Sequence, residues 1–354
     1  MRHDQWMRHD HSPSFLTPII WCILLCEAAE RFAYFGFRAI LVLYLTRELH
    51  FTEPNSIAIF AYVASLAYFT PLLGALLADG SWGRYTTITR FGLMYAIGLT
   101  ILTTGALCFE QDEAEEQDES NLDAGKLYWK RLVSFVGLFL ICIGTGGIKP
   151  CVSAFGADQV ESSESIRAFF AYFYFCINLG AVTSIFLVPL LKSKFGFGFA
   201  FLAPTLFIYL ALTLFWSKRN EYKHHMPEDS LGNMFLLCGI LLRKRVKRWY
   251  QTRRGGYLDL GSPSIEEEGE EQEEESYIDH KWSHQQLQDA EQTLNILPVL
   301  SMLPIFWMLY DQQGSVWTLQ ATRMALPYGI QPEQMNVSCQ CLPEHTHTSC
   351  KECK

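Results

Sequence analysis

The most regular feature of the chain is a series of long apolar runs divided by shorter polar segments. A run of about 20 apolar residues is long enough to cross a bilayer as a helix. The pattern therefore predicts an all-α, polytopic membrane protein with seven spans. We place these spans at 17–46, 57–79, 87–108, 132–154, 168–191, 199–217 and 295–320.

The first apolar run differs from the others because it contains four ionisable residues, Glu27, Glu30, Arg31 and Arg38. Their spacing places them with Tyr34 along one stripe of a helix. A charge in hydrocarbon is costly, so the stripe must face partners or water inside a bundle. Two carboxylates beside one arginine favour binding of a proton by one of them, which predicts a proton-coupling site. A buried salt bridge that only fixes helix packing is the alternative.

The fourth span carries a lone cation in the segment G-T-G-G-I-K-P at 144–150. The glycines should allow neighbouring helices to approach closely. Lys149 then becomes either a partner for Glu27 or Glu30 or a contact for an anion. The alternative is a lysine whose amine extends to the membrane surface.

Other polar and aromatic residues within the spans are candidates for contact with a ligand. Tyr174 and Asn178 are four residues apart and share a helix face, although Asn178 could instead hydrogen-bond to another helix. The interpretation of Trp307 is also open, because tryptophan is common at membrane interfaces. The remaining candidates are Tyr68, Tyr310, Gln313 and the buried-charge candidate Asp311.

Lysine and arginine counts predict a cytoplasmic N-terminus, because the basic residues gather in the segments on that side. The resulting organisation is a cytoplasmic segment at 1–16, a six-helix bundle at 17–217, a cytoplasmic linker at 218–294, a seventh span at 295–322 and an extracytoplasmic tail at 323–354. Within the linker, Asn233–Trp249 is apolar and then basic. This segment is either an amphipathic helix on the inner membrane surface or a basic cluster that only sets topology, and the second interpretation is slightly favoured.

Composition adds little about partners. The chain has 354 residues and a net charge of −9, which comes largely from two acidic runs at 110–119 and 266–275. Nucleic acid is not an expected partner. No catalytic triad, phosphate loop or nucleotide fingerprint is present in the sequence, so we expect neither an enzyme nor a bound cofactor.

Four of the eleven cysteines lie in the last sixteen residues together with two histidines. Zinc binding is possible by residue type. We favour an unrelated tail from an incomplete gene model, and so expect no metal site. The residues are Cys339, Cys341, His345, His347, Cys350 and Cys353.

Five segments together resemble the proton-coupled oligopeptide transporters of the major facilitator superfamily. They read E-A-A-E-R-F-A-Y-F-G-F-R-A-I-L-V-L-Y-L, A-Y-F-T-P-L-L-G-A-L-L-A-D, G-T-G-G-I-K-P-C-V-S-A-F-G-A-D-Q, F-Y-F-C-I-N-L-G-A and F-W-M-L-Y-D-Q-Q-G-S-V-W-T-L-Q-A-T. The resemblance covers residues 15 to about 335. It implies a major facilitator fold, here the N-terminal six-helix bundle plus the first helix of the C-terminal bundle.

The resemblance also implies a function: symport of di- or tripeptides with protons by alternating access, in the plasma membrane or an endolysosomal or vacuolar membrane. The implied partners are a small peptide, a proton and the lipid bilayer, and the oligomeric state is left open. The implied proton-coupling residues are Glu27, Glu30, Arg31 and Lys149. The implied substrate contacts are Tyr34, Arg38, Tyr68, Lys149, Tyr174, Asn178, Trp307 and Gln313.

The chain departs from the family pattern at several points. Ala61 and Asn295 stand where animal peptide carriers have a histidine and an arginine, and Phe35 stands where the family has a tyrosine. The family fold has two six-helix bundles, whereas this sequence has no apolar span after the seventh. A non-transporting fragment or regulatory partner of a full-length carrier is therefore an alternative, as is a proton-coupled nitrate or metabolite carrier.

Overall fold

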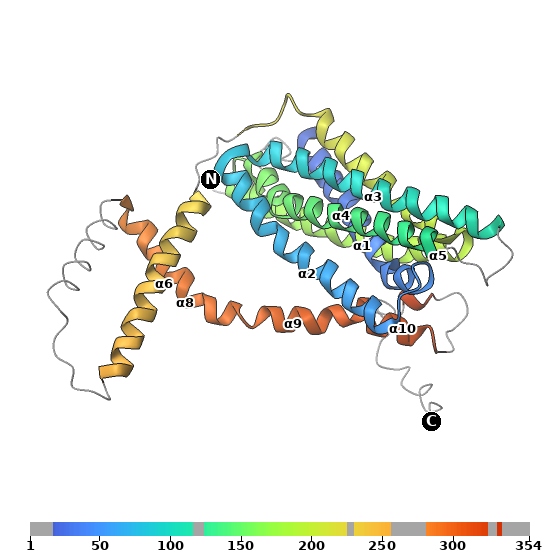
Figure 1. The fold of residues 1–354 in the computed structure, drawn as a ribbon. Coiled ribbons are helices and arrows are strands. Elements are labelled where there is room, and N and C mark those ends of the chain that lie inside the picture. The colour runs from blue at the N-terminus through green and yellow to red at the C-terminus, as the bar shows by residue number, and fades with distance from the viewer. Residues whose placement is uncertain (1–16, 116–123, 225–229, 256–280, 325–330, 335–354) are drawn as a thin grey trace, which may run out of the picture. The chain divides into compact units, whose positions relative to one another are not determined.

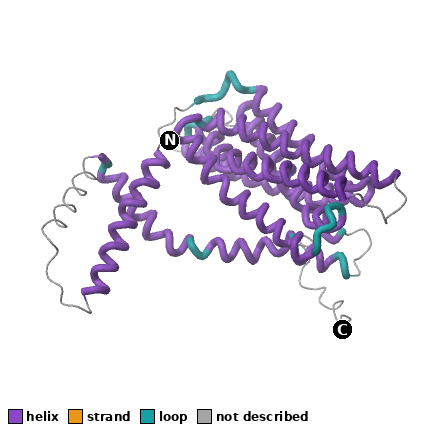
Figure 2. Tube along the Cα trace, in the orientation of Figure 1, coloured by secondary structure: helices purple, strands orange, loops and turns teal. Residues whose placement is uncertain are grey.

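The computed structural model describes residues 17–115, 124–224, 230–255, 281–324 and 331–334, and the regular elements in these ranges are all helical (Figure 2). The predicted all-α class is confirmed. The N-terminal segment 1–16, residues 116–119 of the first acidic run, all of 266–275 and the cysteine-rich residues from 335 lie outside the described residues. The chain divides into two compact units, which are described separately below.

The first unit is a helical bundle that comprises Met1–Ala78, Trp82–Met226 and Asp311–Lys354 (Figure 1). In this unit α1 packs along α5, α3 packs along α4 and α5, and α2 packs along α4. Three short helices complete it after residue 310. The elements are α1 (Pro18–Arg47), α2 (Glu53–Leu77), α3 (Arg84–Glu115), α4 (Ala124–Asp158), α5 (Ser163–Ser217), η3 (Asp311–Gly314), α10 (Val316–Ala321) and η4 (Pro332–Gln334), with η1 (Ala78–Trp82) at the end of α2.

Helix α1 is the centre of the bundle. It begins where Thr17 accepts a hydrogen bond from the backbone amide of Ile20, and Pro18 occupies the first turn, where a missing amide hydrogen costs nothing. Most of its side chains are buried, including three of its five charged ones. A helix that is largely apolar and largely buried must pack against other helices along most of its length.

The predicted close approach at the glycines of the fourth span is confirmed. A Cβ atom on Gly146 would lie 2.0 Å from the hydroxyl oxygen of Thr70 in α2. A Cβ atom on Gly147 would lie 2.0 Å from the ring of Phe91 in α3. Any larger residue at these positions would therefore push α4 away from its neighbours.

Two predicted spans, 168–191 and 199–217, lie within the single helix α5. The helix is broken at Gly196, whose φ of 86° and ψ of −179° are not helical. Residues with a Cβ atom rarely adopt this φ, so glycine allows one span to turn directly into the next. Among the described residues, four helices are long and apolar enough to span a membrane, or five if the bent pair His284–Leu300 and Leu303–Ala321 forms one span. Helix α1 is not among them because its apolar run carries several charges.

The second unit comprises Asp79–Ser81 and Pro227–Tyr310 and contains α6 (Ser230–Gly255), α8 (His284–Leu300) and α9 (Leu303–Tyr310). Part of the segment that we expected to be a linker, 218–294, is thus helical. The helix of the seventh span begins at His284, not at 295, because Ser283 and Gln286 form a capping box there. The span is also interrupted, since Pro304 cannot donate a backbone hydrogen bond to the turn before it.

Candidate functional site

The two carboxylates of α1 share one arginine. Arg31 Nε lies 3.0 Å from Glu27 Oε1, and Arg31 Nη2 pairs with Glu30 Oε2. Glu27, Glu30 and Arg31 are 4%, 1% and 8% exposed, respectively. If all three were ionised, this buried cluster would carry one net negative charge. Binding of a single proton would make it neutral, which is the property required of a proton-coupling group.

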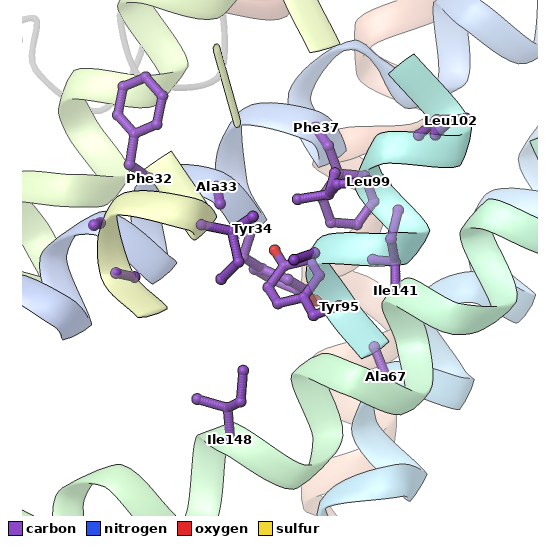
Figure 3. Packing of buried hydrophobic residues seen from close by; sticks show 14 of the residues in the cluster. Phe32, Ala33, Tyr34, Phe37, Ala67, Tyr95, Leu99, Leu102, Ile141 and Ile148 are labelled. Atoms are coloured by element: carbon purple, nitrogen blue, oxygen red, sulfur yellow. The ribbon is translucent and has the colours of Figure 1, made fainter. Parts of the chain in front are cut away.

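Two residues next to this cluster were missed by the sequence analysis. Thr145 of α4 donates a hydrogen bond of 3.3 Å from its hydroxyl to Glu30 Oε1. Tyr95 of α3 is fully buried, and its hydroxyl has no hydrogen-bond partner among the described residues. Figure 3 shows Tyr95 and Tyr34 among buried residues from α2 and α4 such as Ala67 and Ile141. The G-T-G-G segment could have indicated Thr145, whereas nothing in the sequence indicates Tyr95.

Lys149 lies on the ring face of Tyr34. Its Nζ is 3.6 Å from the centroid of that ring and 5.7 Å from the centroid of the Tyr68 ring. In the described part of the chain no carboxylate lies within ion-pair distance of this amine, so the predicted partnership with Glu27 or Glu30 is not formed here. A cation held by aromatic faces is positioned to receive an anionic group.

Arg38 forms an ion pair with an acidic residue from a distant part of the chain. Its Nη2 lies 2.5 Å from Asp311 Oδ1, and its guanidinium carbon lies 5.2 Å from the centroid of the Phe60 ring. Both charged side chains are 15% exposed. An anionic ligand at Arg38 would compete with Asp311 for the guanidinium group.

The other four predicted ligand contacts lie in α5, in η3 and in the second unit. Asn178 donates to the backbone carbonyl of Tyr174 at 2.8 Å, within its own helix, and Tyr174 is 69% exposed. Gln313 lies in η3 beside Asp311, and its backbone carbonyl accepts a hydrogen bond from the hydroxyl of Thr318. Trp307 belongs to the second unit, where its ring lies 5.4 Å from that of Tyr310. The structure therefore assembles seven of the eleven predicted residues: Glu27, Glu30, Arg31, Tyr34, Arg38, Tyr68 and Lys149.

Two further ion pairs join the segment after residue 310 to the bundle. Lys192 near the break in α5 pairs with Glu333 of η4, and both side chains are buried. Arg323 Nη2 contacts both carboxylate oxygens of Glu53 at the start of α2, at 2.6 and 2.5 Å. Glu53 follows the connection from α1 to α2, and Lys192 precedes the turn within α5, so both pairs lie at the same end of the bundle. We call this end the outer end.

The described residues contain no group of three or more histidine, cysteine or acidic side chains arranged to hold a metal ion. What they do contain is a balanced set of charges: three acids and three bases are held in or beside α1. The set is electrically balanced when all six groups are ionised.

The fold is similar to that of solved transporters. One is "In meso crystal structure of the POT family transporter PepTSo", with a TM-score of 0.65 and 27% identity, matched over 90% of this chain and 65% of that one. Another is an auto-inhibited POT family peptide transporter, with a TM-score of 0.65 and 25% identity over the same shares. The fold and the long apolar helices thus define the class: a helical membrane protein whose fold is similar to that of the POT family transporters.

The sequence profile of the POT family matches residues 85–338, and the chain belongs to this family. Similar relatives include solute carrier family 15 member 2 from Danio rerio, 36% identical, and peptide transporter family 1 from Drosophila melanogaster, 35% identical. Each match covers 89% of this chain but only 41% and 40% of the relative. The chain thus spans about two fifths of the length of these relatives.

Proposed function

We propose that this chain provides the proton-binding half of a transporter that carries di- or tripeptides together with protons by alternating access. The observation that carries the proposal is the pairing of Arg31 with both Glu27 and Glu30 inside α1. A buried cluster with one surplus carboxylate gains electroneutrality when it binds a proton. Membership of the POT family and the name of the Drosophila relative support a peptide as the cargo.

The proposal assigns the two remaining cations to the peptide carboxylate. Lys149 is held by aromatic rings and Arg38 is held by Asp311. A peptide carboxylate that binds Arg38 releases Asp311, and with it the contact between α1 and η3. Binding of the substrate would then be coupled directly to opening of the outer end. Tyr34 and Tyr68 complete the wall around Lys149, while Tyr174, Asn178, Trp307 and Gln313 remain proposed contacts in other conformations.

The proposed role is transport and not chemical conversion of the peptide. The distribution of basic residues supports a cytoplasmic N-terminus and a cytoplasmic α6, with the outer end on the opposite side of the plasma membrane or of an endolysosomal or vacuolar membrane.

The test is uptake of a radiolabelled dipeptide by vesicles that contain the protein, with and without an inwardly directed proton gradient. We expect the gradient to stimulate uptake and Glu30→Gln to abolish the stimulation. Glu164→Gln makes the same change at an exposed position in the first turn of α5 and should leave uptake unaltered. Uptake that ignores the gradient, or that nitrate suppresses and unlabelled dipeptide does not, would contradict the proposal.

A further inference from the structure

Helix α6 has one apolar face that is covered within its own unit. Leu237 is buried against Trp282 and Ala290, and the Cys238 thiol lies 3.9 Å from the carbonyl oxygen of Ala290. This contact accounts for the side of α6 that faces α8. It does not account for the apolar residues on the opposite side of the helix.

A second apolar stripe runs along the other side of α6. Phe235, Leu242, Val246 and Trp249 are separated by seven, four and three residues, which places them on one helix face. Their exposed fractions are 50%, 44%, 54% and 54%. Leu237 lies two residues after Phe235, about 200° around the helix, so the stripe points away from α8. An amphipathic helix with two apolar faces requires a second apolar environment.

The charges on α6 are all of one sign. Arg243, Lys244 and Lys247 follow or interleave with the apolar stripe, and no acidic residue occurs from Ser230 to Gly255. Arg243 and Lys247 are four residues apart and flank the stripe on one side. A helix with an apolar stripe and a basic border complements a surface that is apolar below and anionic above.

The contact with α8 places α6 at the level where the seventh span enters the membrane. Arg245 Nη2 donates to Asn295 Oδ1 at 2.9 Å. Asn295 immediately precedes the run 296–310, which contains no charged residue. In a membrane span, the position next to the uncharged run lies at the level of the lipid headgroups. Helix α6 is therefore held at headgroup depth by its own neighbour.

We infer that α6 binds the surface of a bilayer that contains anionic phospholipids, with the stripe 235/242/246/249 in the interface and Arg243 and Lys247 on lipid phosphates. A basic amphipathic helix can also bind a soluble protein such as calmodulin. Lipid is favoured because α8 already covers one side of α6 and because the Asn295 contact holds α6 beside the membrane. The inference does not depend on the proposed cargo.

The experiment measures hydrogen exchange in the α6 segment of the protein in two kinds of vesicle: phosphatidylcholine alone, and phosphatidylcholine mixed with phosphatidylserine. We expect slower exchange in the mixed vesicles. Each basic residue near an anionic surface changes surface binding about fivefold, so Arg243→Gln with Lys247→Gln should weaken the lipid-dependent protection about 30-fold. Lys218→Gln with Arg219→Gln removes the same charge at the end of α5 and should leave the protection unchanged.

A second variant tests the apolar stripe without changing charge. Leu242→Gln with Val246→Gln should also reduce the protection, since both residues are exposed and neither packs on α8. Equal exchange of α6 in both kinds of vesicle would overturn the inference. Protection by calcium-loaded calmodulin in phosphatidylcholine vesicles, without any effect of phosphatidylserine, would also overturn it in favour of a protein partner.

Discussion

The charged cluster inside α1 is built on a different principle from the ion pairs that join the segment after residue 310 to the bundle. We call these the outer pairs: Arg38–Asp311, Lys192–Glu333 and Arg323–Glu53. Glu27, Glu30 and Arg31 lie within five residues of one helix, and Glu27 and Arg31 have the i,i+4 spacing that brings side chains together. Arg38–Asp311 and Lys192–Glu333 join residues that are 273 and 141 positions apart. The first group therefore persists whenever α1 is helical, whereas the second forms only when the segment after residue 310 lies on the bundle.

Their charge balance differs as well. The cluster has two acids for one base, but each outer pair has one of each. Because the cluster has one more acid than base, it can bind a proton and become neutral. A pair with one acid and one base breaks when its two partners move apart. The comparison supports the proposal that α1 holds the proton site and that the outer pairs hold a closed state, and four predictions test this division.

The largest effect is expected for Arg31→Gln, which leaves two buried carboxylates without a countercharge. Removing one partner of a buried ion pair costs about 3–5 kcal/mol. Glu27→Gln should cost only about 1 kcal/mol, because Arg31 keeps Glu30 as a partner and the cluster becomes neutral. The free energy of unfolding in mixed micelles measures both, and equal losses for the two variants would contradict the idea of a surplus carboxylate.

Next in size is Glu333→Gln, which leaves Lys192 buried without its partner. We expect a loss of about 3 kcal/mol in the same measurement. Lys192→Met removes the other partner of the same pair, so we expect it to lower the free energy of unfolding by about the same amount as Glu333→Gln. The double variant should recover most of the loss, and a double-mutant cycle gives the coupling between the two residues. Additive losses would show that the pair does not form in solution.

A smaller effect is expected for Asp311→Asn, since this pair is partly exposed. The charge-assisted hydrogen bond to Arg38 should account for about 1.5–3 kcal/mol. Its loss should loosen η3 and α10, and so increase hydrogen exchange of the backbone amides in Val316–Ala321 more than in α1. An equal increase in both segments would mean that Asp311 stabilises the whole bundle and not the outer segment in particular.

The smallest effect is expected for Arg323→Gln. Its side chain is 68% exposed and that of Glu53 is 43% exposed, and surface pairs of this kind contribute about 0.2–1 kcal/mol. High salt should remove the same contribution from the unaltered protein. A loss as large as that of Glu333→Gln would contradict the ranking of the outer pairs by burial.

Features that depend on local spacing could be predicted from the sequence, and those that depend on distant contacts could not. The apolar runs predict the bundle helices, and the spacing of Glu27, Glu30 and Arg31 predicts their shared stripe. Asp311 could be recognised as a buried charge, but no pattern identifies Arg38 as its partner across 273 positions. Pairing at that separation depends on tertiary packing, on which local periodicity gives no information.

The predicted polar contacts of α5 show a second limit. Asn178 was expected to need a partner from another helix or from a ligand, yet the carbonyl of Tyr174 in the preceding turn satisfies one amide hydrogen. The sequence places the two residues on one face but does not show that the helix itself provides the hydrogen bond. The helix that contains the predicted seventh span also begins before the span, because the capping box at Ser283 precedes the apolar run by about twelve residues.

The turn at Gly196 has a practical consequence for experiments on orientation. It connects two membrane crossings with helical residues on both sides and with no polar loop between them. An epitope, protease site or fluorescent reporter inserted there would have to unwind one of the two helices to become accessible. Mapping which compartment the outer end faces therefore requires labels elsewhere, and the connection between α1 and α2 around Leu49–Thr52 offers a non-helical place for one.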